Sequence, residues 1–340
     1  MERTTTNYQI KEVRAEATYV CNQKCLHCYA LDGTPNQHGL PEVFAPEDGA
    51  LVKWLTKLRA DHGTERLSLT GGEVLLPSFL DNTLGLVKQA RSLDMKIRIM
   101  TNGTTLTDRV LERLTEAAGD PRAVTLQISI DSADPAVHDA FRGAPGSLNK
   151  TIDGVRRAVA AGFIVHIRYS IREGEADDVV GGYRLACELG AHSFIVKPVF
   201  ETGRARTNVQ FVAGQNTVRD AQLQLAEASC DGTTPVKLAQ PIYITHADLP
   251  PGANIQFTEC NCGKSGVTID QYGNAIPCNY ISGTDSRADF TLGNILDPAF
   301  DLAQAWNKED TFVWYRNRDT SVGTCPSDGV LQGCCLGDDD

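Results

Sequence analysis

The chain has 340 residues, of which 41% are hydrophobic and 7% aromatic, enough for one large core or for one core with a small additional module. Its formal net charge of −11 argues against nucleic acid and other polyanionic partners, because binding them needs a positive surface that displaces counterions. A neutral or cationic substrate fits this charge better.

The beginning of the chain has no apolar stretch typical of a secretory signal, and no run of about eighteen apolar residues could span a bilayer. We therefore expect a cytoplasmic protein without a membrane partner. Eleven cysteines in such a protein indicate metal or cluster binding rather than disulfides, because the cytosol keeps thiols reduced.

Between residues 13 and 200, short runs of β-forming residues alternate with longer helical segments, which is typical of parallel βα units. Leu51, Leu55 and Leu58 show helical spacing after the first run, and Gly162 marks the end of a later helix. Six such units can form a doubly wound sheet or a partial barrel, and periodicity alone does not decide between them. The expected strands cover residues 15–19, 66–70, 97–101, 124–130, 164–171 and 193–198.

A cysteine triad, Cys21, Cys25 and Cys28, follows the first expected strand. Three thiols in one short loop can surround a four-iron cluster and leave one iron open for a chelating ligand. A zinc knuckle or a redox-active thiol pair is the alternative for this spacing. Because parallel strands end at one edge of a sheet, residues after the next three strands are expected beside the triad. These residues are Gly71, Gly72, Glu73, Asn102, Gly103, Asp131 and Ser132.

The character of the chain changes after residue 200. Residues 201–255 are polar and poorly periodic, and we expect a connector with one helix near 217–228. Six of the eleven cysteines lie between residues 260 and 335, which predicts a second, cluster-binding module, with a zinc ribbon as the alternative. The expected domains are therefore a core at 1–200, a connector at 201–255 and a module at 256–340.

The triad, with Tyr29 directly after it, resembles the signature of the radical S-adenosylmethionine superfamily. The resemblance implies an α/β fold, a partial (β/α)6 barrel of the TIM type with a small C-terminal iron–sulfur module. It also implies that the open iron of a [4Fe–4S] cluster chelates S-adenosylmethionine, and that one-electron transfer yields methionine and a 5′-deoxyadenosyl radical. A flavodoxin- or ferredoxin-like protein would supply the electron.

Further segments resemble the cofactor-binding strand ends of this superfamily. The Gly-Gly-Glu run is similar to the family's Gly-Gly-Glu-Pro motif, with Val74 in place of the proline. Glycines allow close approach to a ligand, and the carboxylate can accept a hydrogen bond from the methionine ammonium group. The cofactor-binding residues implied by the resemblance are Gly71, Gly72, Glu73, Asn102, Ser129, Asp131, Arg142, Arg168 and Val196.

The C-terminal cysteines resemble the SPASM or Twitch module of the same superfamily. Asp328 and Asp338 stand where the full two-cluster pattern has cysteines, so we expect one auxiliary [4Fe–4S] cluster. Cys262 could alternatively be a free thiol that donates a hydrogen atom to a substrate radical. Four ligands are expected from Cys260, Cys262, Cys278, Cys325, Cys334 and Cys335.

The resemblance implies an enzyme that abstracts a hydrogen atom from a substrate carbon, leading to epimerisation, dehydrogenation, elimination or decarboxylation. Only about twenty residues precede the triad, which favours a small substrate such as a sugar or aminocyclitol over a peptide bound by a fused recognition domain. Modification of a ribosomal peptide is the alternative. A non-catalytic zinc or electron-transfer protein would not explain the Gly-Gly-Glu and Asn-Gly runs at neighbouring strand ends.

Overall fold

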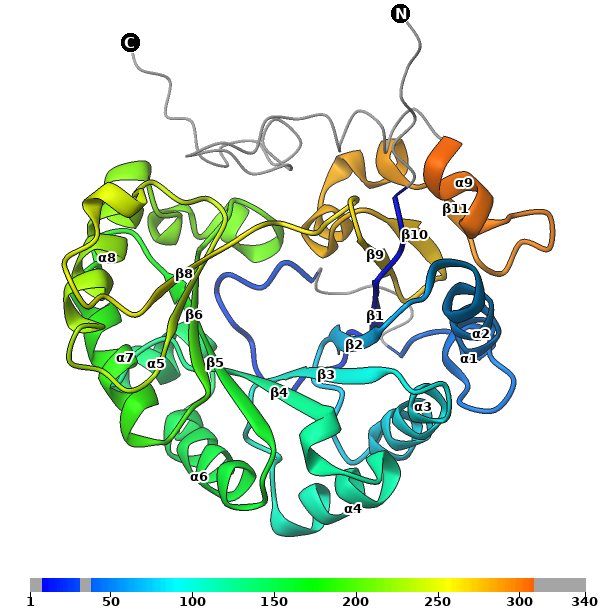
Figure 1. Ribbon diagram of the computed structural model, residues 1–340, viewed down its shortest axis with the longest axis horizontal. Coiled ribbons are helices and arrows are strands. Elements are labelled where there is room, and N and C mark those ends of the chain that lie inside the picture. Colours follow the sequence, from blue (N-terminus) through cyan, green and yellow to red (C-terminus); the bar gives the residue numbers. More distant parts are fainter. Residues whose placement is uncertain (1–7, 31–37, 309–340) are drawn as a thin grey trace, which may run out of the picture.

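Eight parallel strands follow one another in chain order and curve into an open barrel (Figure 1). The computed structural model describes residues 8–30 and 38–308, and Cys325, Cys334 and Cys335 lie outside the described residues. All six expected strands are present, and the predicted partial barrel is confirmed. The strands are β1 (Glu12–Thr18), β2 (Arg66–Gly71), β3 (Lys96–Thr101), β4 (Val124–Ser129), β5 (Ile164–Ile171), β6 (Ser193–Pro198), β7 (Val236–Ala239) and β8 (Ile255–Thr258).

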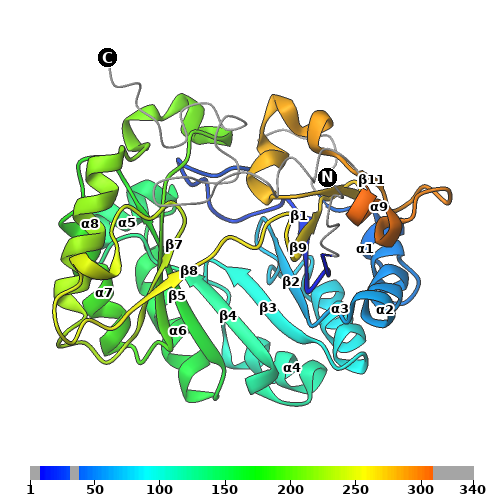
Figure 2. The same ribbon diagram turned by 45° about the horizontal axis from the view of Figure 1, so that its top comes forward.

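Helices pack around the outside of the barrel (Figures 1 and 2). The predicted helix stop at Gly162 is confirmed, since this residue follows α6 with a left-handed φ of 84°. The helices are α1 (Pro41–Phe44), α2 (Ala50–His62), α3 (Leu80–Ser92), α4 (Asp108–Ala118), α5 (Pro135–Arg142), α6 (Ser147–Ala160), α7 (Asp178–Glu188), α8 (Gln215–Ala228) and α9 (Leu302–Lys308).

The strands have an apolar outer face and a polar inner face, as β4 illustrates. Val124, Leu126 and Ile128 are fully buried in the core between strands and helices. Each such burial contributes roughly 1.5–3 kcal/mol to folding. Gln127 and Ser129 alternate with them and line a cavity inside the barrel. A closed TIM barrel fills this interior with branched apolar side chains, whereas this open barrel presents polar groups to a binding space.

Two strands lie in the segment that we expected to be a connector. β7 and β8 are four residues each and extend the parallel sheet beyond β6, and α8 matches the helix expected there. Val236 and Leu238 are buried, while Lys237 between them lines the cavity. The domain limits expected at residues 200 and 255 therefore fall within one continuous sheet.

A hairpin from the C-terminal part joins the opposite end of this sheet. β9 (Gly266–Ile269) pairs in parallel with β1, and β10 (Asn274–Ile276) and β11 (Gly293–Asn294) add antiparallel strands. This pairing places residues near Cys260 beside the strand that leads to the triad. Within residues 8–30 and 38–308, no helix combines the length and apolar character needed to cross a membrane.

Candidate active site

The loop that carries the cysteine triad leaves β1 and lies against the end of α5. The backbone amides of Lys24 and Leu26 donate hydrogen bonds to the carbonyls of Arg142 and Phe141, at 3.1 and 3.0 Å. These two backbone hydrogen bonds hold the loop against the end of α5, as hydrogen bonds hold neighbouring strands together in a sheet. As a result, the loop presents three thiols to one cavity, those of Cys21, Cys25 and Cys28.

A glycine after β6 allows a second segment to pack closely against the same loop. Gly203 has a left-handed φ of 54°, and a Cβ at this position would lie 2.3 Å from the carbonyl oxygen of Cys28. The amide of Arg204 donates a hydrogen bond to that oxygen at 2.9 Å. Nothing local in the sequence distinguishes Gly203 from an ordinary turn glycine, so the sequence did not identify it.

Arg142 connects the triad to a buried carboxylate. Its guanidinium donates a hydrogen bond to the Cys25 sulfur at 3.7 Å and forms an ion pair with Asp131. The amide of Ser170 donates to the same carboxylate at 2.8 Å. Burial alone would raise the pKa of Asp131, but Arg142 and other nearby cations hold this pKa below its usual range. Asp131 therefore lies behind Arg142 and does not line the cavity, in contrast to the expected cofactor contact.

Glu73 joins the ends of β2 and β3. Its carboxylate accepts hydrogen bonds from the Thr101 hydroxyl at 2.8 Å and from the Asn102 amide at 2.7 Å. A Cβ at Gly72 would lie 2.2 Å from the carbonyl oxygen of Val20, so this glycine permits close contact with the segment between β1 and the triad. The Gly-Gly-Glu run thus connects the ends of β2 and β3 to the segment that leads into the triad, in addition to any contact with a ligand.

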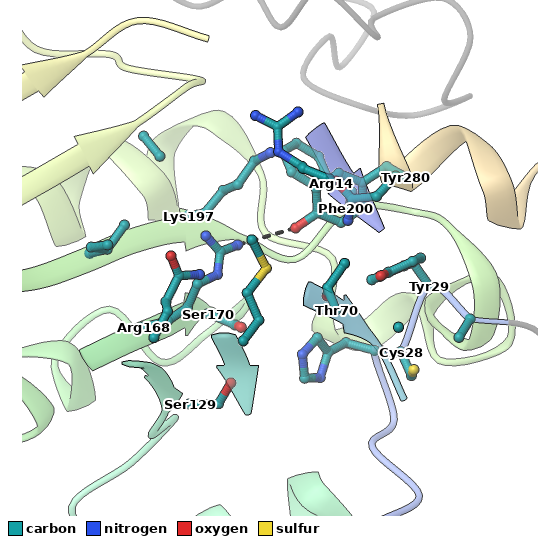
Figure 3. Close-up of a pocket in the computed structure, with 18 of the residues that line it drawn as sticks. Arg14, Cys28, Tyr29, Thr70, Ser129, Arg168, Ser170, Lys197, Phe200 and Tyr280 are labelled. Carbon is teal, nitrogen blue, oxygen red and sulfur yellow. Dashed lines mark hydrogen bonds between the residues drawn. The ribbon is translucent and has the colours of Figure 1, made fainter. Parts of the chain in front are cut away.

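A cavity of about 590 Å³ fills the open barrel, which is in the range of small-molecule sites. Arg168 and Ser170, expected on one face of β5, both point into this cavity (Figure 3). Val196 instead packs in the core, because side chains alternate along β6 and Lys197 takes the inward direction. The other expected cofactor-binding residues that line the cavity are Gly71, Gly72, Glu73, Asn102, Ser129 and Arg142.

A second group of thiols lines the same cavity. Hydrogen bonds with the thiols of Cys260 and Cys278 hold the pKa of the buried Cys262 thiol well below its usual range. The Arg14 guanidinium donates a hydrogen bond to the Cys262 sulfur at 3.6 Å and another to the Asn261 side chain. Three of the six C-terminal cysteines therefore converge, with a buried cation beside them.

Cysteine thiolates are the protein ligands of iron–sulfur clusters, so both thiol groups have the chemistry that such clusters need. In the described part of the chain, no group of three or more His, Cys, Asp or Glu side chains is arranged to hold one ion. Desolvation raises the pKa of the Cys28 thiol to about 11.

Tyr280 connects the second thiol group to the barrel. It lies in a short 3-10 helix (Asn279–Gly283) directly after Cys278. The Arg168 guanidinium donates a hydrogen bond to its hydroxyl at 3.1 Å, and the Lys197 ammonium lies 4.3 Å from its ring centroid (Figure 3). Phe200 packs against the same ring at 5.0 Å. The sequence did not reveal this wall, because it forms between residues far apart in the chain.

Two family models match this chain. The model of the radical SAM superfamily matches residues 16–182, and that of the SPASM iron–sulfur cluster-binding domain matches residues 260–335. An AdoMet-dependent heme synthase of Methanosarcina barkeri is 30% identical, covering 94% of this chain and 89% of its own. The subtilosin biosynthesis protein AlbA of Bacillus subtilis is 25% identical, covering 94% of this chain and 66% of its own. The mycofactocin maturase MftC of Mycobacterium tuberculosis is 27% identical over 94% and 75%, respectively.

The solved structures give the same fold. SuiB of Streptococcus suis, crystallised with the precursor peptide SuiA, superposes with a TM-score of 0.69 at 15% identity. The match covers 92% of this chain and 68% of SuiB. At this level of identity the likeness concerns the architecture alone.

Proposed function

Because the chain belongs to the radical S-adenosylmethionine superfamily of enzymes and carries a SPASM domain, we propose that it modifies a ribosomally made precursor peptide. S-adenosylmethionine, a [4Fe–4S] cluster and an auxiliary iron–sulfur cluster are its cofactors. When bound, these groups supply radical chemistry that removes a hydrogen atom from a substrate carbon.

The preference for a sugar, an aminocyclitol or a related natural-product intermediate is wrong. Relatives of this chain are named for bacteriocin biosynthesis and for maturation, and SuiB was solved with a precursor peptide. The expectation relied on the short segment before the triad, but a peptide can be recognised elsewhere on such a protein. Modification of a ribosomal peptide, the alternative, fits AlbA, MftC and SuiB better.

The observation that carries the proposal is the cavity shared by the two thiol groups. Its volume of about 590 Å³ suits a cofactor and a short part of a peptide, so most of the peptide would stay outside the barrel. Arg168, Lys197 and Tyr280 form the wall between the two thiol groups. They would hold the reacting side chain still and exclude water while the hydrogen atom is removed.

Each thiol group has a proposed role. Cys21, Cys25 and Cys28 would hold the cluster that binds S-adenosylmethionine, and Arg142 would orient Cys25. Cys260, Cys262 and Cys278 would hold the auxiliary cluster. The convergence of these three thiols favours Cys262 as a ligand over Cys262 as a free hydrogen donor. A flavodoxin- or ferredoxin-like protein remains the proposed reductant.

The test uses anaerobically purified chain with reconstituted clusters, S-adenosylmethionine, reduced flavodoxin and candidate precursor peptides encoded beside its gene. Mass spectrometry should detect 5′-deoxyadenosine together with a peptide of changed mass or, in deuterated water, of added deuterium. A variant with all three triad cysteines replaced by alanine should form neither product. Cleavage of S-adenosylmethionine with every peptide left unchanged would contradict the proposal.

A further inference from the structure

The base of the cavity carries a group of basic side chains that neither thiol group explains. Arg66 begins β2, Arg98 lies in β3, His166 in β5 and Lys237 in β7, and all four line the cavity. We call these four residues the basal cluster. They lie in the N-terminal halves of their strands, whereas the triad and its neighbouring residues follow the C-terminal ends.

The strand register directs these side chains inward. In β5, His166 alternates with Val165 and Ile167, which are fully buried in the core. The same alternation places Arg98 between the buried Ile97 and Ile99 in β3. A barrel that only needed packing would carry branched apolar side chains at these inner positions. Basic residues there indicate a space that receives polar or charged groups.

The charge of the basal cluster is only partly compensated. Glu12 is the carboxylate that faces it, with ion pairs to Arg98 at 2.9 Å and to Arg14 at 3.3 Å. Ser68 and Asn261 also donate hydrogen bonds to Glu12, so this carboxylate is saturated. Among the described residues, none forms an ion pair or a side-chain hydrogen bond with two other members of the cluster, Arg66 and Lys237.

These groups are close enough to influence one another. Burial lowers the pKa of Lys237, and the charges of Arg98 and Arg66 lower it further. Burial, Lys237 and Arg98 together lower the pKa of His166 to about 3, so this imidazole is neutral at physiological pH. Bringing like charges together in a cavity lowers the stability of the fold. Such unfavourable arrangements are typical of functional sites, where a ligand of opposite charge binds.

The other cations of the cavity already have partners. Arg14 lies against the Cys262 sulfur, and Arg142 lies between Cys25 and Asp131. Those two guanidinium groups therefore complement the thiolates that would hold the clusters. Among the described residues, Glu12 is the carboxylate paired with the basal cluster, through Arg98, which leaves Arg66 and Lys237 to receive a negatively charged group that enters the cavity.

We propose that the basal cluster binds a carboxylate group of the substrate. Under the peptide function proposed above, on which this step rests, the group is an Asp or Glu side chain or the C-terminal carboxylate of the precursor peptide. The net charge of −11 suggested a neutral or cationic substrate. It describes the whole surface, whereas the cavity has the opposite sign.

Binding of a simple dicarboxylate tests the site directly. Glutarate is added at low ionic strength to the reconstituted enzyme, with uncharged glutaramide as the matched probe, and the melting temperature is followed against concentration. Glutarate should raise the melting temperature of the wild type. Lys237→Met and Arg66→Met should weaken its apparent affinity roughly tenfold, as expected for the loss of one charged hydrogen bond. Lys237→Arg should retain the response.

Arg156→Met is the control, because Arg156 is exposed on α6 and pairs only with Asp153 among the described residues. Its response to glutarate should equal that of the wild type. Equal stabilisation by glutarate and glutaramide would overturn the proposal. An undiminished glutarate response in both Lys237→Met and Arg66→Met would overturn it as well. Normal cluster absorbance shows that these variants are folded.

A modified peptide identifies the source of the carboxylate. Its Asp and Glu residues are replaced by Asn and Gln, or its C-terminus is amidated. With the wild-type enzyme, one of these changes should raise KM roughly tenfold. With Lys237→Met, the same change should raise KM by a smaller factor. If the peptide is modified equally well in all forms, the carboxylate site fails while the peptide function stands. If glutarate binds as expected but no peptide is modified, the site stands and the peptide function fails.

Discussion

At the scale of single residues, Cys262 decides how the second thiol group works. If Cys262 is a ligand beside Cys260 and Cys278, as proposed above, it is needed for a complete auxiliary cluster. Cys262→Ala should therefore lower iron from about eight atoms per chain to about four. Cys187→Ala, on α7 and away from both thiol groups, should leave the iron content unchanged. Full iron content with loss of the peptide product would instead make Cys262 a hydrogen donor.

Glu16 predicts a pH dependence of stability. It is fully buried and accepts hydrogen bonds from the Tyr19 hydroxyl at 2.6 Å and the Ser282 hydroxyl at 3.2 Å. Burial raises its pKa from 4.5 to about 8. Between these values the unfolded carboxyl ionises while the folded one keeps its proton, so the wild type loses stability as the pH rises.

Glu16→Gln is neutral throughout this window, so its advantage over the wild type should grow as the pH rises to about 8. The gain is expected to be on the order of a few kcal/mol. Thermal unfolding at a series of pH values measures it. Glu65→Gln removes an exposed ion pair with Lys11 and should change stability little at any pH. A constant difference between Glu16→Gln and the wild type would show that Glu16 is ionised in the folded state.

Which residues face the cavity was only partly predictable from the sequence. Arg168 and Ser170 were placed on one face of a strand by simple alternation, and both line the cavity. Alternation does not say which face is the inner one, so the basic residues of the basal cluster were missed. Asp131 was recognised from its position after a strand, but its pairing with Arg142 depends on a helix that returns to the triad.

At the scale of elements, the position of the triad loop depends on a glycine in the segment after β6. Gly203→Ala would place a methyl group 2.3 Å from the Cys28 carbonyl oxygen, in a left-handed conformation with φ 54°. The conformation alone costs roughly 1–2 kcal/mol, and the contact must also displace the loop. Gly203→Ala should therefore lose iron from the triad cluster faster on exposure to a chelator.

Gly252→Ala is the matched control, because Gly252 is also left-handed, with φ 89°, but has no atom within 4 Å of the added Cβ. It should lower the melting temperature slightly and release iron at the wild-type rate. Equal iron loss in the two variants would mean that the contact with Cys28 does not hold the loop. The loss of iron is measured as the decrease in absorbance at the charge-transfer bands of the clusters.

The regular elements were predictable to the extent that they repeat. Six βα units gave six strands within a few residues, because each strand is followed by a turn and a helical spacing. β7 and β8 have only four residues each and lie in a polar segment, so their alternation was too short to stand out. Their place in the sheet comes from pairing with β6, which is tertiary information.

At the scale of the whole molecule, the C-terminal segment and the barrel share one sheet. β9 pairs with β1, and the Asn307 side chain exchanges hydrogen bonds of 2.9 and 3.0 Å with the backbone of Tyr8. Such pairing between distant segments cannot be read from local patterns. Its consequence is that the barrel and the described part of the cluster-binding segment should unfold together.

Trp306 tests this cooperativity, because its side chain on α9 is fully buried in the same core cluster as β1 and α2. Trp306→Ala should cost roughly 3–5 kcal/mol and lower the melting temperature of one common transition. Val209→Ala, at a side chain that is 56% exposed, should have almost no effect. Calorimetry of the anaerobic enzyme should show a single peak that moves as a whole. If Trp306→Ala splits off an early peak and leaves the main one in place, the C-terminal segment unfolds separately from the barrel.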